Sequence, residues 1–150
     1  MPSRTSACLP VVATLILTSA AVARADAKSP VVELIDRQVA AYNAKNVEAF
    51  LACYAPSAEL LEFPDKSLAK GTAALRERYT KRFADPILHA TISDRIVLGN
   101  KVIDHEKITI TWPEGPGTWE AAAIYEVENG LIARVWFIFG AKTVDAAKPR

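Results

Sequence analysis

Residues 41–55 have the sequence AYNAKNVEAFLACYA, in which one helical pattern ends and another begins. The polar residues 43–46 interrupt the first helix, and the Asn46 side chain can cap the backbone N–H groups of the next one. A short second helix is predicted over Val47 to Tyr54, with Phe50 on its apolar face. Two helices joined by a short polar break are therefore expected.

A longer helix precedes this break. Ser29 and Pro30 form a helix start, because serine caps the first turn and proline at the first helical position loses no hydrogen bond. The apolar residues that follow recur at helical spacing, and they are Val31, Ile35, Val39 and Tyr42. A helix is therefore predicted from residue 30 to residue 42.

A third helix is predicted after Lys70-Gly71, with Thr72 as its cap. Its core face has helical spacing and consists of Leu75, Tyr79 and Phe83. Four basic residues lie off this face, and they are Arg76, Arg78, Lys81 and Arg82. These four side chains are predicted to face solvent, as charged residues on the outer side of an amphipathic helix do.

After residue 88 the spacing of the apolar residues changes from helical to alternating, which is typical of strands. Five strands are predicted in all, over residues 58–63, 88–98, 101–112, 118–128 and 131–139. The last two are joined by Asn129-Gly130, a dipeptide typical of tight two-residue hairpin turns. Helices followed by consecutive antiparallel strands predict an α+β domain with the helices on one face of the sheet.

The first 25 residues have the pattern of a secretory signal peptide. Arg4 supplies a positive charge, residues 7–22 are apolar or small, and Ala23-Arg24-Ala25 matches the A-x-A cleavage pattern. The apolar stretch of about 15 residues is shorter than the roughly 20 that span a bilayer as a helix. We therefore expect residues 1–25 to be removed rather than to stay as an anchor. The protein is then periplasmic or secreted, without membrane association after cleavage.

The expected mature part is nearly neutral. Loss of the two arginines in the signal peptide leaves 16 of the 18 basic residues against 17 acidic ones, a formal net charge of −1. The chain therefore has no excess of positive charge that would attract nucleic acid. With 51% hydrophobic and 23% charged residues, the composition is that of a globular protein and argues against disorder.

Cleavage would also remove Cys8 and leave Cys53 as the single cysteine, so no internal disulfide can form. The apolar setting of Cys53 favours a buried structural thiol over a nucleophile. We expect one domain over residues 26–141 and a disordered tail over residues 142–150.

Three segments together resemble the nuclear transport factor 2-like superfamily, which includes ketosteroid isomerases, SnoaL-type polyketide cyclases and scytalone dehydratase. They are residues 41–55, Gly71-Thr72 at the third helix, and Asn129-Gly130-Leu131-Ile132 before the last strand. The resemblance covers residues 30–140. It implies a cystatin-like cone, in which three N-terminal helices pack on a curved antiparallel β-sheet and enclose an apolar pocket. It also implies a cofactor-free homodimer joined through the sheet, which an exposed face carrying Trp136 and Ile138 would fit.

In ketosteroid isomerases this pocket holds an aspartate base and an oxyanion hole made by a tyrosine and a protonated aspartic acid. By the resemblance, the base position corresponds to Glu62 of this chain. The tyrosine position corresponds to Gln38 and the acidic position to Ala123. The chain thus keeps a candidate base and lacks both oxyanion donors.

Asp104-His105-Glu106 is the most polar run within an otherwise apolar predicted strand. Alternation places Asp104 and Glu106 on one face and His105 on the other. Either the two carboxyl groups or the histidine therefore look into the pocket as partners of Glu62, and a surface triplet is the third alternative. The spacing of histidines and carboxylates matches no metal-binding motif, so no metal site and no cofactor are expected.

Tyrosines and larger aromatic residues are the candidates for contact with a ligand, since in this fold the core wall is also the pocket wall. They are Tyr42, Tyr54, Trp112, Trp119, Tyr125, Phe137 and Phe139. The leading hypothesis is a protein that binds a small, largely apolar carbonyl compound and catalyses a proton shift such as isomerisation, dehydration or cyclisation. The alternative is a non-catalytic module that binds a ligand or a protein partner.

Overall fold

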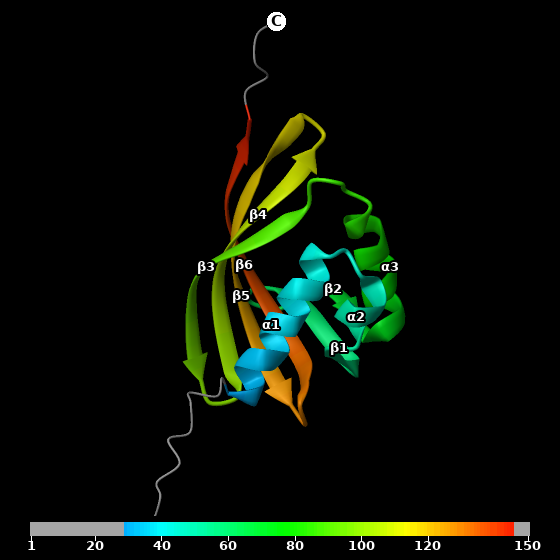
Figure 1. The fold of residues 1–150 in the computed structure, drawn as a ribbon, viewed down its shortest axis with the longest axis vertical. Helices are drawn as coiled ribbons and strands as arrows, with labels where there is room; N and C mark the ends of the chain where they lie inside the picture. Colours follow the sequence, from blue (N-terminus) through cyan, green and yellow to red (C-terminus); the bar gives the residue numbers. More distant parts are fainter. Residues whose placement is uncertain (1–28, 146–150) are drawn as a thin grey trace, which may run out of the picture.

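The computed structural model describes residues 29–145, and the predicted signal peptide lies outside this range. Its elements are, in chain order, α1 (Pro30–Asn43), α2 (Val47–Leu51), β1 (Tyr54–Glu62), β2 (Lys66–Lys70), α3 (Gly71–Phe83), β3 (His89–Leu98), β4 (Lys101–Trp112), β5 (Gly115–Glu128) and β6 (Leu131–Val144). The predicted α+β class is confirmed, with three helices on one side of a curved sheet (Figure 1).

The helices begin as predicted in two cases out of three. The hydroxyl of Ser29 accepts a hydrogen bond from the backbone N–H of Val32 (3.3 Å), and Asn46 caps α2 through the N–H of Ala49 (3.0 Å). The prediction for α3 is wrong by two residues: the helix is preceded by Lys70, and the Thr72 hydroxyl donates instead to a carbonyl of β1.

Helix α2 is shorter than predicted, because Tyr54 already belongs to strand β1. Strand β2 (Lys66–Lys70) was not predicted; its KSLAK sequence is largely polar, and it occupies an edge of the sheet. Strand β6 reaches Val144, so the first residues of the predicted tail belong to the sheet, while residues 146–150 lie outside the described range.

The six strands form one sheet in the order β2-β1-β6-β5-β4-β3. All neighbouring pairs are antiparallel except β1 and β6, which run parallel. The parallel pair carries β1 into the sheet beside the last strand, although the two are far apart in the sequence. Asn129 and Gly130 both have positive φ, as the predicted hairpin turn between β5 and β6 requires.

The core between the helices and the sheet is rich in aromatic rings. Phe50 is fully buried, and its ring centroid lies 4.1 Å from that of Tyr79 and 4.9 Å from that of Tyr54. Helix α1 is tied to β3 by the Asn43 side chain, which donates to the carbonyl of Ala90 (2.9 Å) and accepts from its N–H (2.8 Å). These contacts hold the helices in place over the sheet, and thereby set the walls of the space between helices and sheet.

The sequence analysis also concerned the single cysteine of the expected mature part, membrane association and self-association through the sheet. Cys53 is buried, as predicted, and burial raises the pKa of its thiol. No helix in the described range is long and apolar enough to cross a membrane. On the outer face of the sheet Ile138 is 45% exposed and Trp136 is half-buried, so self-association through this face stays a prediction.

Candidate functional site

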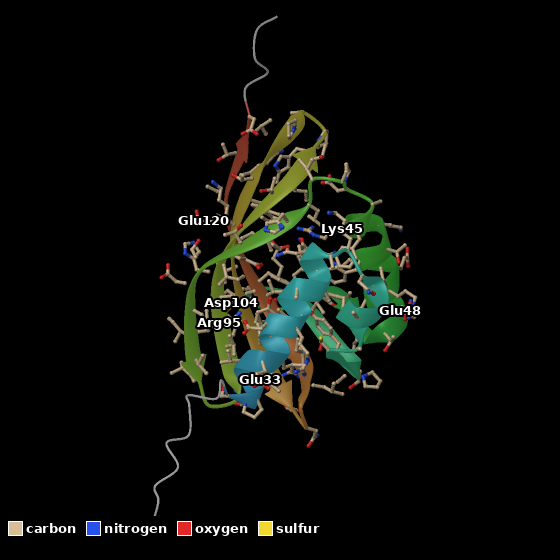
Figure 2. The ribbon with its side chains drawn as sticks, in the orientation of Figure 1. Glu33, Lys45, Glu48, Arg95, Asp104 and Glu120 are labelled. Atoms are coloured by element: carbon tan, nitrogen blue, oxygen red, sulfur yellow. The ribbon has the colours of Figure 1, made fainter. Side chains whose placement is uncertain are left out.

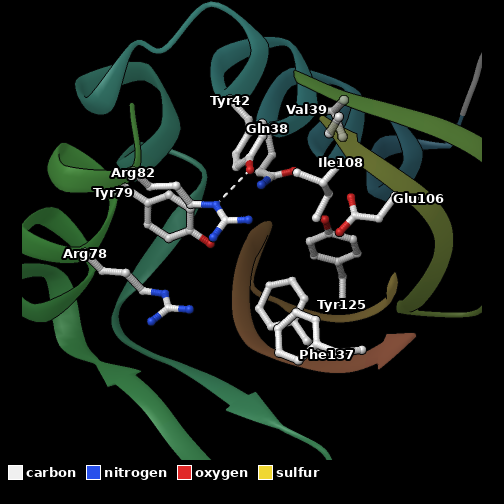
Figure 3. A pocket seen from close by; sticks show the side chains of 12 residues that line it. Gln38, Val39, Tyr42, Arg78, Tyr79, Arg82, Glu106, Ile108, Tyr125 and Phe137 are labelled. Carbon is white, nitrogen blue, oxygen red and sulfur yellow. Dashed lines mark hydrogen bonds between the residues drawn. The ribbon is translucent and has the colours of Figure 1, made fainter. Parts of the chain in front are cut away.

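An inner pocket lies between helices α1 and α3 and the helix-facing side of the sheet (Figure 3). The side chains that line it are Gln38, Val39, Tyr42, Arg78, Tyr79, Arg82, Ala90, Glu106, Ile108, Tyr125, Phe137 and Phe139. Most of the wall is apolar or aromatic. A few polar groups converge on it, which is the usual composition of a small-molecule site.

The sheet side of the inner pocket carries Glu106. Glu106 is 6% exposed, and its carboxyl group forms no hydrogen bond or ion pair with any residue of the described range. Burial and the nearby Asp104 charge raise the pKa of Glu106 to about 7, against a smaller opposing effect of Arg82. The protonated and the ionised form of Glu106 are therefore both populated near neutral pH, whereas an ordinary surface glutamate is ionised there.

The helix side of the inner pocket carries Tyr42 and two arginines of α3. Arg82 donates from Nε to the Tyr42 hydroxyl (2.9 Å), and Figure 3 shows both groups across the pocket from Glu106. Burial raises the pKa of Tyr42, so its phenol stays protonated at neutral pH. Because the phenol oxygen already accepts from Arg82, its own proton is left to be donated to a ligand oxygen.

Gln38 adds an unpartnered polar atom to the same pocket. The residue is 4% exposed, and its Nε2 donates to the Tyr54 hydroxyl (3.2 Å). Its Oε1 is buried without a hydrogen-bond partner among the described residues. A buried acceptor without a hydrogen bond lowers the stability of the folded state by about 1–3 kcal/mol. A ligand that donates a hydrogen bond to Gln38 Oε1 would recover part of that free energy.

Asp104 lies two residues before Glu106 on strand β4, and its carboxylate is bound by Arg95. Arg95 donates from Nε and Nη2 to the two carboxylate oxygens (2.6 and 2.7 Å), and from Nη1 to Asp36 (2.6 Å). Asp104 is fully buried, and Figure 2 labels it together with Arg95. Asp104 therefore acts on the pocket through its charge and not by contact with a ligand.

The inner pocket is narrow and adjoins a wider space. Its open volume is about 30 Å³, enough for a water molecule. The outer cleft, between α3 and the end of β4, has an open volume of about 610 Å³ and shares Arg78 and Arg82 with the inner pocket. A ligand larger than a few atoms must therefore lie partly in the outer cleft or displace side chains.

The sequence of residues 35–135 matches the SnoaL-like domain, which is most of the part of the chain that the structure describes. The chain belongs to the SnoaL-like family. Among curated proteins, no sequence matches this SnoaL-like domain.

Solved structures share the fold of this SnoaL-like domain. A cystatin-fold protein from Novosphingobium aromaticivorans is 26% identical, with a TM-score of 0.67 over 75% of this chain and 99% of its own. The Δ5-3-ketosteroid isomerase from a Mycobacterium species is 20% identical, with a TM-score of 0.67 over 77% and 98%. A computationally designed 17-OHP binder is 18% identical, with a TM-score of 0.67 over 76% and 94%. The predicted superfamily is thereby confirmed.

The SnoaL-like domain brings together only part of the residues that the sequence singled out. Tyr42, Glu106, Tyr125, Phe137 and Phe139 all line the inner pocket. Of the three alternatives for the polar triplet, the one in which the carboxyl face turns to the helices is observed. His105 lies on the outer face, where its Nε2 is 2.6 Å from Glu120.

Glu62 does not line the inner pocket. Its carboxylate accepts a hydrogen bond from Lys66 (2.8 Å) at the end of β1, where its side chain is 37% exposed. Its register partner on β6 is the pocket residue Phe137, so it lies beside the site and not in it. The position that the resemblance implies for the base thus lies outside the inner pocket, whereas Glu106 of the polar triplet lines it.

Three of the predicted ligand contacts also lie outside the inner pocket. Tyr54 is buried under it, where its hydroxyl accepts from Gln38. Trp112 packs edge-on against Trp119 (5.3 Å), and Trp119 stacks on Phe139 (4.0 Å). The two tryptophans thus continue the aromatic wall beyond the inner pocket.

The structure overturns the prediction for two of the four arginines and lysines on α3. Arg78 and Arg82 line the inner pocket, whereas Arg76 is exposed and paired with Glu48, as predicted for a solvent-facing residue. The sequence signal for this was weak. Residues next to Tyr79 and Phe83 lie at the border of the apolar face, and a long side chain at the border can reach either side.

No group of three metal-ligating side chains occurs between residues 29 and 145.

Proposed function

We propose that this SnoaL-like domain is an exported protein that binds a small, largely apolar carbonyl compound and moves a proton on it, with Glu106 as the proton-transfer group. The observation that carries the proposal is a buried carboxyl group that has no hydrogen-bond or ion-pair partner among residues 29–145, in a pocket of aromatic and aliphatic side chains. A carboxyl group in this setting is retained at a cost in stability, because burial disfavours its charged form.

The chemistry needs no co-reactant. The Glu106 carboxylate takes a proton from the carbon next to the carbonyl, and the electron pair of that C–H bond moves to give an enolate oxygen. Tyr42, whose hydroxyl is polarised by Arg82 (2.9 Å), donates a hydrogen bond to this oxygen. The protonated Glu106 then returns the proton to another carbon, which yields an isomer and regenerates the carboxylate. A pKa of about 7 suits both directions of transfer.

Gln38 and Ala123 stand where ketosteroid isomerases have their two oxyanion donors. In this proposal the Tyr42–Arg82 pair takes over their role. Tyr42 lies one helical turn after Gln38 on the same face of α1, so both can reach one ligand. The names of two proteins of the same fold, a Δ5-3-ketosteroid isomerase and a 17-OHP binder, make steroid ketones reasonable first probes.

The test is a thermal-shift screen of the mature chain, residues 26–150, against steroid ketones, aromatic ketones, short polyketides and fatty acids. A ligand at about a hundred times its dissociation constant stabilises the folded state by roughly 2.7 kcal/mol, which raises Tm by several degrees. A shift that the Glu106→Gln and Tyr42→Phe variants alter would support the inner pocket as the site. No shift with any class would contradict the proposal, and binding without turnover would leave the non-catalytic alternative.

A further inference from the structure

Arg78 stands where the inner pocket and the outer cleft meet. It lines both spaces together with Arg82, which lies one helical turn further along α3. Within the described range, Arg78 forms no hydrogen bond and no ion pair. Figure 3 shows its guanidinium group beside the ring of Tyr79, on the opposite side of the pocket from Glu106.

The acidic side chains around Arg78 are already engaged elsewhere. In the outer cleft, Glu77 pairs with Lys81 (2.7 Å). Asp85 accepts from the backbone N–H of Thr111 (2.6 Å) and from its hydroxyl (2.9 Å). Among residues 29–145, no carboxylate forms an ion pair with Arg78, whose positive charge therefore lies at the mouth of the pocket without a direct partner there.

Arg82 adds to this positive charge. Only its Nε is used, in the hydrogen bond to Tyr42, and no residue in the range 29–145 accepts from its terminal nitrogens. Arg78 and Arg82 thus present a set of unfilled donors toward the space between pocket and cleft. Guanidinium donors form a planar fork that matches a carboxylate, and such charge-assisted pairs are the stronger hydrogen bonds of proteins.

We propose that the ligand of this site is an oxo acid, whose carboxylate is bound by Arg78 at the mouth while its carbonyl end enters the inner pocket toward Glu106. The inference rests on the proposed function, because it concerns the same site and names the class of its ligand. A carboxylate is favoured over a phosphate monoester, because it carries the single negative charge that one guanidinium group balances, whereas a phosphate monoester carries about −1.5 to −2 at pH 7.

The test compares one acid with its uncharged ester. The probes are benzoylpropionate, an aromatic oxo acid, and its methyl ester, which has the same ketone and ring. Dissociation constants are measured by calorimetry for wild type, Arg78→Gln and Arg76→Gln. Arg76 is a matched control, because it lies on the same helix and loses the same charge, but it is paired with Glu48 and lines neither space.

Wild type and Arg76→Gln are expected to bind the acid about tenfold or more tightly than the ester, and this preference should weaken as salt is added. In Arg78→Gln the preference should fall to about one, through weaker binding of the acid and not of the ester. Arg78→Lys, which keeps the charge but loses the fork, should recover part of it. The Tm of each variant without ligand shows that it is folded.

The two proposals fail in different ways. If acid and ester bind wild type equally well, or if Arg78→Gln keeps the preference, the carboxylate inference is overturned while the pocket stands. If Arg76→Gln loses the preference as fully as Arg78→Gln does, the effect is one of general charge and the inference is equally overturned. If neither compound binds, and the wider ligand screen is also flat, the proposed function falls together with it.

Discussion

Glu106→Gln is expected to lower kcat for the proposed isomerisation, with a β,γ-unsaturated ketone as the probe, by about 10²–10⁴-fold relative to wild type, the usual loss when a proton-transfer group is removed. Glutamine has nearly the same shape but cannot accept or return the proton. KM should change much less, because the pocket wall stays in place. For wild type, the rate should rise with pH up to about 7 and then level off, as Glu106 changes to the carboxylate that accepts the proton. The appearance of the conjugated ketone can be followed by absorbance.

Glu62→Gln is the informative comparison, since Glu62 stands at the position that the superfamily resemblance implies for the base. Its carboxylate is bound to Lys66 and lies outside the inner pocket, so this variant is expected to keep most of the wild-type rate. The opposite pattern, with activity lost in Glu62→Gln and kept in Glu106→Gln, would show that the base is at the inherited position and that the account given for Glu106 is wrong.

Arg95→Gln is expected to lower the free energy of unfolding by about 3–5 kcal/mol, the range for removing one partner of a buried ion pair. Arg95 is the residue that neutralises the fully buried Asp104, through two hydrogen bonds of 2.6 and 2.7 Å. Without it, a buried carboxylate would have to be desolvated alone or take up a proton. Urea denaturation of the variant and of wild type measures the difference.

Two further variants separate this pair from the rest of the network. Asp36→Asn removes the outer partner of Arg95, whose side chain is 38% exposed, and should cost much less. The double variant Arg95→Gln/Asp104→Asn should recover a large part of the loss, because no unpaired charge is left in the core. A loss in Arg95→Gln below about 1 kcal/mol would mean that the buried pair does not hold this part of the sheet.

Much of the fold could be predicted from the sequence, because its signals are local. Ser29 and Asn46 mark helix starts by capping, and Asn129-Gly130 marks a hairpin by its tolerance of positive φ. The pairing of β1 with β6 and the existence of β2 were not predictable in this way. The pairing joins residues far apart in the chain, and β2 (Lys66–Lys70) lacks a long apolar pattern.

The candidate site was less predictable, since it depends on which face of each element turns inward. Alternation in β4 left open whether Glu106 or His105 would face the helices, and only the packed sheet decides this. Counting from the resemblance selected Glu62, although its side chain engages a neighbour on the rim. Arg78 was assigned to solvent because helical spacing sorts residues by direction but not by the reach of a long side chain.

The central claim is that Glu106 is a buried pocket carboxyl group that exchanges its proton near neutral pH. It is tested most directly by an NMR pH titration of the Glu106 side-chain carboxyl carbon, assigned by its loss in Glu106→Gln. We expect a midpoint near 7, because burial and the Asp104 charge outweigh the effect of Arg82. A midpoint near 4.5, the ordinary value for glutamate, would show that the carboxyl group is well solvated, and would contradict the account.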